Sequence, residues 1–192
     1  MNPEQGTLIS RAQAMSALLE LLTDQPLIVC NGFPSREVQK IADRSTHFYM
    51  IGSMGNAPAI ALGVALAKPH KQVVTFDGDG NILMGMGTLA TVGALRPKNF
   101  LHVVFDNEVY GTTGNQPTIS NVVPLDKVAK AAGYVNVERV LDREDLVYEF
   151  KDMLKKDGPS LLLIKVNEFA EDAGRIVLDP PDITKRFMKA IE

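Results

Sequence analysis

Residues 73–117 read VVTFDGDGNILMGMGTLATVGALRPKNFLHVVFDNEVYGTTGNQP, and two short apolar runs within this stretch each end in polar residues. Asp79 stands between two glycines just after the first run, and Asn107 stands just past the end of the second run. Either position alone is compatible with an ordinary turn, because turns use Asp, Asn and Gly freely. The same arrangement at the ends of two successive apolar runs indicates that Asp79 and Asn107 serve one common function.

The rest of the chain alternates in the same manner around this stretch. Short apolar runs predict strands at residues 26–32, 47–51, 72–76, 99–105, 134–140 and 160–166. Helical spacing of apolar positions predicts helices at residues 10–22, 34–44, 56–67, 82–95, 125–133 and 143–156. Strands that alternate with helices predict an α/β fold of three layers, a parallel sheet with helices on both faces.

Length and composition narrow the class of protein. The 192 residues predict a single domain over 1–192, with a tail from about residue 168 that holds a short helix at 183–191. The net charge of -3 gives no support for nucleic-acid binding, and no apolar run reaches the ~18 residues that would span a bilayer. The N-terminus lacks the apolar core of a signal peptide, so we expect a cytoplasmic protein. Cys30 is the only cysteine, which excludes a disulfide framework.

The two polar strand ends predict a ligand site. Asp79 and Asn107 would both lie at carboxyl ends of parallel strands, the edge where such sheets bind ligands. If those strands are neighbours, a carboxylate and an amide oxygen converge, and such hard ligands suit Mg²⁺ held together with phosphates. Gly78 and Gly80 let the backbone approach a phosphate, and a helix beginning near Asn81 offers free N–H groups. A Mg²⁺-bridged diphosphate fits this pattern.

The motif also resembles a known family. Gly78-Asp79-Gly80-Asn81, followed by Asp106-Asn107 and EVYG, is similar to the fingerprint of thiamin diphosphate enzymes. The resemblance implies that the side chains of Asp79 and Asn107 and the carbonyl of Val109 would bind the metal. It implies that Gly80, Asn81 and Thr112 would contact the diphosphate. The further cofactor-binding residues that it implies here are Gly78, Asp79, Asn107, Tyr110 and Gly111.

A second stretch, FYMIGSMGNAPAIALGVAL at residues 48–66, resembles the segment that holds the aminopyrimidine ring in these enzymes. By this resemblance the Gly52 carbonyl would accept a hydrogen bond from the 4′-amino group, and Met54 would support the bent cofactor, with Ser53 between them. Together with NGFPSRE and DNEVYGTTGNQPT, the chain looks most similar to the sulfopyruvate and phosphonopyruvate decarboxylases, over residues 26–167.

The resemblance implies a function and partners. The chain looks like the diphosphate-binding β subunit of a decarboxylase that uses thiamin diphosphate and Mg²⁺ to convert a 2-keto acid with an anionic tail into an aldehyde and CO₂. No catalytic residue is expected in this chain, because the family's glutamate belongs to a pyrimidine-binding domain. A pyrimidine-binding α subunit is therefore an expected partner, and self-association through the same fold is expected as well.

Other interpretations stay open at this point. The chain could instead be a non-catalytic module that binds thiamin diphosphate or a nucleotide as a sensor or assembly subunit. A dinucleotide fingerprint fits poorly, because Leu83 occupies the place of its third glycine. His102 is expected to be a hydrogen-bonded strand residue. Arg36 and Arg175 are either exposed surface arginines or contacts for an anionic substrate tail, since guanidinium groups match sulfonate and phosphonate oxygens.

Overall fold

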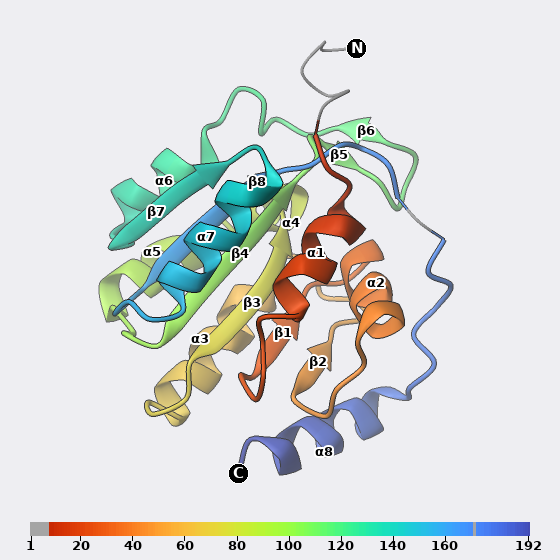
Figure 1. Cartoon of the computed structure of the whole chain (residues 1–192), viewed down its shortest axis with the longest axis vertical. Helices are drawn as coiled ribbons and strands as arrows, with labels where there is room; N and C mark the ends of the chain where they lie inside the picture. The colour runs from red at the N-terminus through yellow and green to blue at the C-terminus, as the bar shows by residue number, and fades with distance from the viewer. Residues whose placement is uncertain (1–7, 171) are drawn as a thin grey trace.

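The structure is a computed structural model, and it describes residues 8–170 and 172–192. Residues 1–7, which belong to the segment interpreted above as lacking a signal peptide, lie outside the described residues. Figure 1 shows a sheet between two layers of helices. The strands of the sheet are β1 (Leu27–Val29), β2 (His47–Tyr49), β3 (Val73–Gly78), β4 (Phe100–Asp106), β7 (Asn136–Val140) and β8 (Ser160–Lys165). The helices are α1 (Arg11–Leu19), α2 (Phe33–Ile41), α3 (Ala57–Ala67), α4 (Asp79–Met84), α5 (Gly87–Leu95), α6 (Leu125–Ala132), α7 (Arg143–Met153) and α8 (Pro180–Ala190).

The six strands form one parallel sheet in the order β2-β1-β3-β4-β8-β7, which confirms the predicted fold class. Strands β3 and β4 are direct neighbours, and their register pairs Gly78 with Phe105. Asp79 and Asn107 therefore leave adjacent strands at the same edge of the sheet. This is the arrangement that the two polar strand ends predicted.

Two apolar cores hold the layers together, one on each face of the sheet. On one face, side chains of α1, α2 and α7 pack with Val74, Phe76 and Leu162 of the strands. On the other face, α3, α5 and α6 pack with Ile28, Val104 and Leu163. Strands β3, β4 and β8 are buried along almost their whole length, as expected for parallel strands that are covered on both sides.

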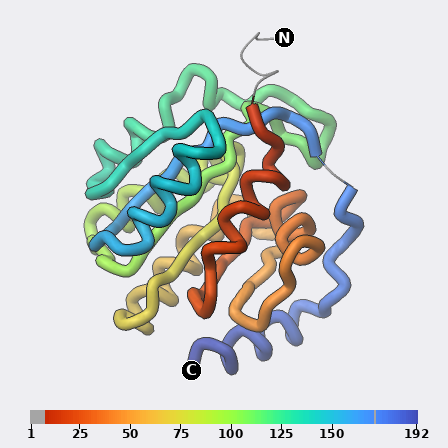
Figure 2. Tube along the Cα trace, in the orientation of Figure 1, coloured from red at the N-terminus to blue at the C-terminus, as the bar shows by residue number. Residues whose placement is uncertain are grey.

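The C-terminal tail covers the edge of the sheet at β2. Figure 2 shows the chain after β8 passing along α2 and turning into α8 beneath β2. Ile183 and Phe187 of α8 are buried, and the ring of Phe187 lies 5.5 Å from that of Phe48. This helix begins three residues earlier than the sequence predicted, because Pro180 and Pro181 fit its first turn.

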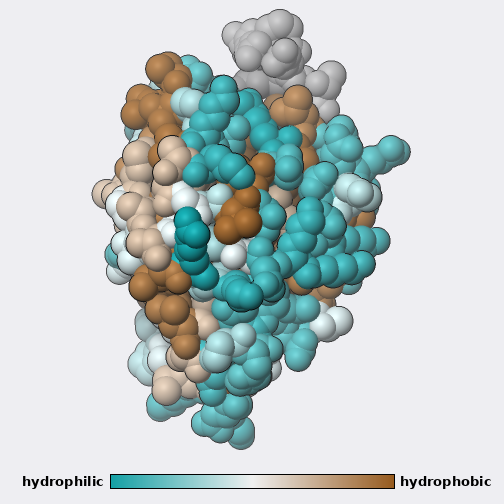
Figure 3. Space-filling model, turned by 90° about the vertical axis from the view of Figure 1, so that its left-hand side faces the viewer, coloured by the Kyte–Doolittle hydropathy of each residue, from teal (hydrophilic) through white to brown (hydrophobic). Residues whose placement is uncertain are grey.

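The opposite edge strand, β7, is protected differently. Glu138 and Arg139 are exposed along this strand, and charged residues on an edge discourage pairing with other sheets. The side of the molecule seen in Figure 3 is largely hydrophilic, with apolar side chains gathered along one margin. None of the helices within the described ranges is long and apolar enough to cross a membrane.

The prediction of one helix over residues 82–95 is wrong. The structure divides it into α4, which begins at Asp79, and α5, which begins at Gly87. Gly85 ends α4 and lies against Gly55, so close that a Cβ atom on Gly85 would come within 2.1 Å of the Gly55 carbonyl oxygen. Gly85 and Gly87 lie two positions apart and disfavour a continuous helix. The backbone contact between Gly85 and Gly55 determines where the helix breaks.

The contact at Gly85 gives a testable stability difference. We expect Gly85→Ala to destabilise the fold by about 3 kcal/mol, because the new methyl group must push backbone rather than a flexible side chain. Gly87→Ala is the matched control, since a Cβ there meets nothing within 4 Å and alanine favours the helix. Urea unfolding of both variants measures the difference. Equal stability of the two variants would contradict the close contact.

Candidate functional site

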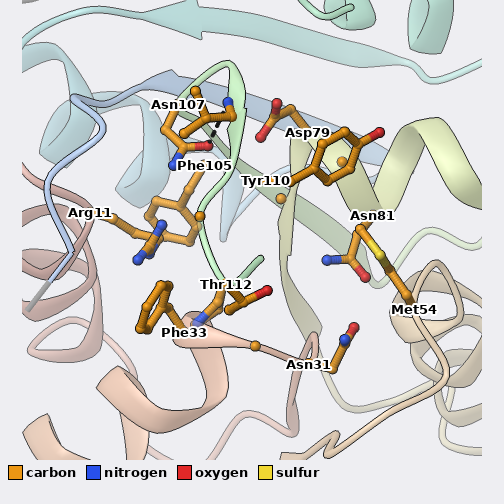
Figure 4. A pocket seen from close by; sticks show the side chains of 16 residues that line it. Arg11, Asn31, Phe33, Met54, Asp79, Asn81, Phe105, Asn107, Tyr110 and Thr112 are labelled. Carbon is orange, nitrogen blue, oxygen red and sulfur yellow. Dashed lines mark hydrogen bonds between the residues drawn. The ribbon is translucent and has the colours of Figure 1, made fainter. Parts of the chain in front are cut away.

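A pocket opens at the carboxyl ends of β1, β3 and β4, where the sequence placed its candidate residues (Figure 4). Nine of the residues predicted for cofactor contact line this pocket, together with the predicted metal ligand Val109. The nine are Met54, Gly78, Asp79, Gly80, Asn81, Asn107, Tyr110, Gly111 and Thr112. Segments that are separated by up to 58 positions in the sequence thus meet at one edge of the sheet.

The three predicted metal ligands converge within this pocket. In the orientation drawn in Figure 4, the side-chain oxygen of Asn107 accepts a hydrogen bond of 3.3 Å from the Val109 N–H. Turned by 180°, the amide nitrogen would lie 3.2 Å from Oδ1 of Asp79 and 2.9 Å from the Val109 carbonyl oxygen. The end of this amide therefore faces two oxygen atoms, which only a donor group or a cation can satisfy.

This cluster fits a magnesium ion in chemistry and in spacing. Neighbouring ligands in an octahedral shell with bonds of 2.0–2.1 Å lie about 3 Å apart, which the two distances from the Asn107 amide match. They supply one carboxylate, one amide and one backbone carbonyl, and such a set leaves positions for phosphate oxygens and water. Within the ranges that the structure describes, no group of three His, Cys, Asp or Glu side chains offers an alternative metal site.

The second carboxylate oxygen of Asp79 is held by Thr118 and Ser120, two residues that the sequence analysis did not single out. Thr118 Oγ donates a 2.5 Å hydrogen bond to Oδ2 of Asp79, and Ser120 Oγ lies 3.3 Å from the same atom. Ser120 also donates to Asp106 at 2.8 Å, and Asp106 forms a 2.9 Å ion pair with Lys165. These contacts fix the carboxylate so that Oδ1 remains directed at Asn107.

Thr118 and Ser120 belong to a loop that follows a short hairpin. Strands β5 (Val109–Tyr110) and β6 (Gln116–Pro117) pair antiparallel and return the chain from the pocket towards Asp79. No strand was predicted from the sequence for residues 109–117. Thr118 lies 39 positions from Asp79, so no local spacing signals their contact.

Burial affects the acidity of Asp79. Removal from water raises the pKa of this carboxyl to about 6, the hydrogen bond from Thr118 opposes this shift, and the nearby Asp106 charge adds to it. In the unfolded chain the pKa is ~3.9, so the native state holds its proton more tightly. Ionised Asp79 therefore lowers the stability of the metal-free fold increasingly as pH rises from about 4 to about 6.

We expect Asp79→Asn to stabilise the metal-free protein by about 2–3 kcal/mol at pH 7 to 8, since the variant buries no charge. The advantage should shrink as the pH falls and vanish near pH 4, where the native carboxyl is neutral as well. Urea unfolding in EDTA at several pH values measures this. A difference that stayed constant with pH would contradict the raised pKa.

Gly80 lets two side chains approach the backbone beside the metal ligands. A Cβ atom there would lie 2.5 Å from Cε1 of Tyr110 and 3.3 Å from Cε of Met54. Figure 4 shows the ring of Tyr110 and the side chain of Met54 on the same side of the pocket as Asn81. Only glycine fits at position 80, so its peptide stays open to the pocket.

Asn81 connects two predicted parts of the site. Its Oδ1 accepts a 2.9 Å hydrogen bond from the N–H of Gly55, next to Met54 in the chain. Its backbone carbonyl accepts from the N–H of Gly85. The side-chain amide nitrogen of Asn81 remains available to the pocket, and as a pure donor it suits an anionic group.

Two predicted residues lie elsewhere. Gly52 and Ser53 do not line this pocket but a neighbouring hollow, together with Ile60 and residues of α8. Ser53 has a positive φ of 58°, and a Cβ on Gly52 would meet nothing within 4 Å. Their predicted contact with an aminopyrimidine ring remains a prediction. Met54, two residues on, turns into the main pocket.

The pocket also contains residues that the sequence did not single out. Arg11 is buried and forms a two-pronged ion pair with Glu37, with contacts of 2.7 and 2.8 Å. Its guanidinium lies 5.6 Å from the ring centre of Phe33, which lines the pocket with Asn31. In the sequence Arg11 resembles an ordinary helix residue, because its acidic partner Glu37 lies 26 positions further along the chain.

Beneath the pocket, His102 is satisfied as the sequence predicted. Its Nε2 lies 3.1 Å from Asp77, and its Nδ1 lies 3.2 Å from the Tyr134 hydroxyl. All three side chains are buried. This network crosses the neighbouring strands β3 and β4 just before the polar strand ends, and it uses no group that faces the pocket.

Residues 30–164 match the family of the thiamine pyrophosphate enzymes through its C-terminal TPP binding domain. The chain belongs to this family. The matched region holds every residue that converges in the pocket except Arg11, and the fold and the fingerprint agree with it. The resemblance that the sequence motifs suggested is thereby confirmed.

Curated relatives make the relationship more specific. The chain is 42% identical over 185 residues to the sulfopyruvate decarboxylase subunit beta of Methanococcus maripaludis, covering 96% of this chain and 98% of that subunit. It is also 42% identical over 180 residues to the phosphonopyruvate decarboxylase of Streptomyces viridochromogenes. That match covers 93% of this chain but 45% of the relative, so the chain spans about half of that protein.

A solved structure supports the fold. Benzoylformate decarboxylase from Polynucleobacter necessarius superposes with a TM-score of 0.66 at 18% sequence identity. The superposition covers 89% of this chain and 35% of that enzyme. At this level of identity the likeness concerns the fold, a parallel six-stranded sheet with helices on both faces.

Proposed function

We propose that this chain is the diphosphate-binding β subunit of a thiamin diphosphate- and Mg²⁺-dependent decarboxylase. Its substrate is a 2-keto acid with an anionic tail, sulfopyruvate or phosphonopyruvate, and its products are an aldehyde and CO₂ in the cytoplasm. The observation that carries the proposal is the convergence of Asp79, Asn107 and Val109 beside Gly78 and Gly80 in a chain of this family. The nearly full-length similarity to a sulfopyruvate decarboxylase subunit beta supports the reaction.

Different residues of the pocket would bind the metal ion and the diphosphate. Asp79, Asn107 and the Val109 carbonyl would hold Mg²⁺ between the protein and the diphosphate. The open peptide of Gly80, the amide nitrogen of Asn81 and the hydroxyl of Thr112 are donors for the phosphate oxygens, and Gly78, Tyr110 and Gly111 shape the pocket around them. Thr118 and Ser120 orient Asp79 by holding its other oxygen.

Met54, Gly52 and Ser53 are the residues that would hold the ring end of the cofactor. Met54 is half-buried beside Gly80, where its thioether can support the ring. Thiamin diphosphate, when bound, supplies the electron sink for loss of CO₂ from the keto acid. The chain's own residues position it and exclude water around the diphosphate.

We propose that a pyrimidine-binding α subunit completes the site. Family chemistry places the essential glutamate in a pyrimidine-binding domain, and the relative of equal length is called a subunit beta. Large apolar side chains are exposed near the candidate site. Ile51, Met84 and Ile119 are between 59% and 68% exposed, and they lie in the segments that carry the site. Exposed apolar side chains of this kind are typical of an interface, and copies of this chain could also associate through the fold.

Co-purification with a candidate pyrimidine-domain subunit tests the proposal. The assembled protein, supplied with thiamin diphosphate and Mg²⁺, is screened for release of CO₂ from sulfopyruvate, phosphonopyruvate and pyruvate. Turnover of an anionic 2-keto acid supports the proposed function. Tight cofactor binding without turnover of any keto acid, with every partner offered, would instead favour a non-catalytic cofactor-binding module.

A further inference from the structure

A second hollow adjoins the cofactor pocket, and it contains both arginines that the sequence left without a role. It has a volume of about 290 Å³ and lies at the carboxyl ends of β1 and β2, between α2 and the C-terminal tail. Its walls include Arg36 of α2, Arg175 of the tail, and the apolar side chains of Met50 and Ile51. We call it the arginine hollow. Gly32 lines both this hollow and the cofactor pocket, so the two spaces are neighbours.

The two guanidinium groups line one common space, and within the described residues neither is neutralised by an ion pair. Among the ion pairs formed by residues 8–170 and 172–192, none involves Arg36 or Arg175. Partial burial and, second, the positive charge of Arg175 lower the pKa of Arg36 from its ordinary value. Asp179 also lines the hollow but pairs with neither arginine. Two like charges directed at one cavity favour an anionic occupant.

The tail is fastened so that Arg175 stays beside α2. Lys40 Nζ donates a 2.9 Å hydrogen bond to the carbonyl of Asp172, and the N–H of Val177 donates to Gln39 at 3.2 Å. Figure 2 shows the tail running alongside α2 over this length. Both fastening side chains belong to α2, the helix that carries Arg36, so the two guanidinium groups belong to one supported unit.

Phe33 connects the arginine hollow to the cofactor pocket. Its ring lies between two guanidinium groups, 5.6 Å from that of Arg11 and 5.5 Å from that of Arg36. The same ring lines the cofactor pocket, and its edge lies 3.5 Å from where a Cβ on Gly111 would stand. Figure 4 shows Phe33 beside Arg11 and Thr112 at one end of that pocket. Arg36 therefore packs on a ring that also lines the cofactor pocket.

We propose that Arg36 and Arg175 form the subsite for the anionic tail of the substrate, a sulfonate or phosphonate. The proposal rests on the proposed function and assigns substrate selection to these two residues. A tetrahedral group with three oxygens can accept hydrogen bonds from two guanidinium forks at once, which a single carboxylate plane does less well. Met50 and Ile51 provide an apolar wall for the methylene group that joins the tail to the keto acid.

The first experiment measures substrate selection in the assembled enzyme. Arg36→Gln, Arg175→Gln and the double variant are compared with the unchanged protein on sulfopyruvate, phosphonopyruvate and pyruvate. We expect the ratio of kcat/KM for the tailed acids over that for pyruvate to fall about 10- to 100-fold for each arginine, mainly through KM. Arg139→Gln, the same change on exposed β7, is the control and should leave the ratio unaltered.

A second measurement does not depend on activity. The chain alone is titrated with sulfoacetate, phosphonoacetate and acetate while the Nε–H signals of its arginines are followed by NMR. Saturable shifts with the first two ions, absent with acetate and absent in the double variant, support the subsite. If this binding is found but no keto acid is decarboxylated by any assembly, the proposed function fails while the anion subsite stands.

Two results would overturn the proposal. One is an assembled enzyme in which both arginine variants keep the preference for sulfopyruvate or phosphonopyruvate over pyruvate. The other is loss of co-purification with the partner subunit in the arginine variants, which would mean that these arginines bind a carboxylate of the partner. Gel filtration of each variant with the partner distinguishes the second result.

Discussion

Asp79→Ala is expected to abolish the Mg²⁺-dependent binding of thiamin diphosphate to the assembled enzyme. The substitution removes the only charged group among the three proposed metal ligands, and the amide of Asn107 and the carbonyl of Val109 cannot replace its charge. We expect the cofactor affinity to fall by about 100-fold or more, which corresponds to about 3 kcal/mol of binding free energy. Calorimetry in Mg²⁺ and in EDTA measures this loss.

Two matched variants make the result specific. Glu144→Ala removes one exposed negative charge at the start of α7 and should leave cofactor affinity unchanged. Met54→Ala should preserve Mg²⁺ binding and loosen the ring end of the cofactor instead. If folded Asp79→Ala protein bound the cofactor as tightly as the unchanged protein, the assignment of the metal site would be wrong.

The chain by itself should show no decarboxylase activity, and adding a pyrimidine-domain subunit should restore turnover. The described residues include the proposed metal ligands, the proposed diphosphate contacts and the segment around Met54, but the proposed acid belongs to the partner. We expect a rate difference of at least about 1,000-fold between the lone chain and the assembly, since general acid–base catalysis contributes 10²–10⁴-fold. Release of CO₂ from sulfopyruvate, with and without the partner, measures it.

The opposite outcome has a clear meaning. Full turnover by the lone chain, at a protein concentration where gel filtration finds no other polypeptide, would show that the catalytic acid lies in this chain. Weak cofactor binding by the lone chain is compatible with the expectation, because the proposed diphosphate contacts lie on this chain.

The convergence of the proposed metal ligands was predictable because it depends on a general property of parallel sheets. Asp79 and Asn107 follow successive strands, and a right-handed crossover places such strands side by side with their carboxyl ends together. The alternation of strands and helices was equally clear, since β3, β4 and β8 are continuous apolar runs. The family resemblance supplied Val109, whose contribution is a backbone carbonyl that no side-chain pattern reveals.

What the sequence could not predict are contacts between distant segments. Thr118 reaches Asp79 only because the β5–β6 hairpin returns the chain to the pocket. The division between α4 and α5 depends on Gly55, thirty positions before Gly85. The arrangement of Arg36 and Arg175 in one hollow likewise depends on the path of the tail. Arg175 comes more than 130 positions after α2 in the sequence.

The hydrogen bond from Gly55 to Asn81 has a consequence for the choice among thiamin phosphates. Asn81 is tied to Gly55 through its side chain and to Gly85 through its backbone, while Gly85 packs on Gly55. The segment that would support the ring and the segment that would bind the phosphates therefore cannot move apart independently. The protein holds these two positions at a set separation, so thiamin monophosphate would reach only one of them. Selection by ligand length would then follow from the rigidity of this junction, without any residue that contacts the terminal phosphate alone.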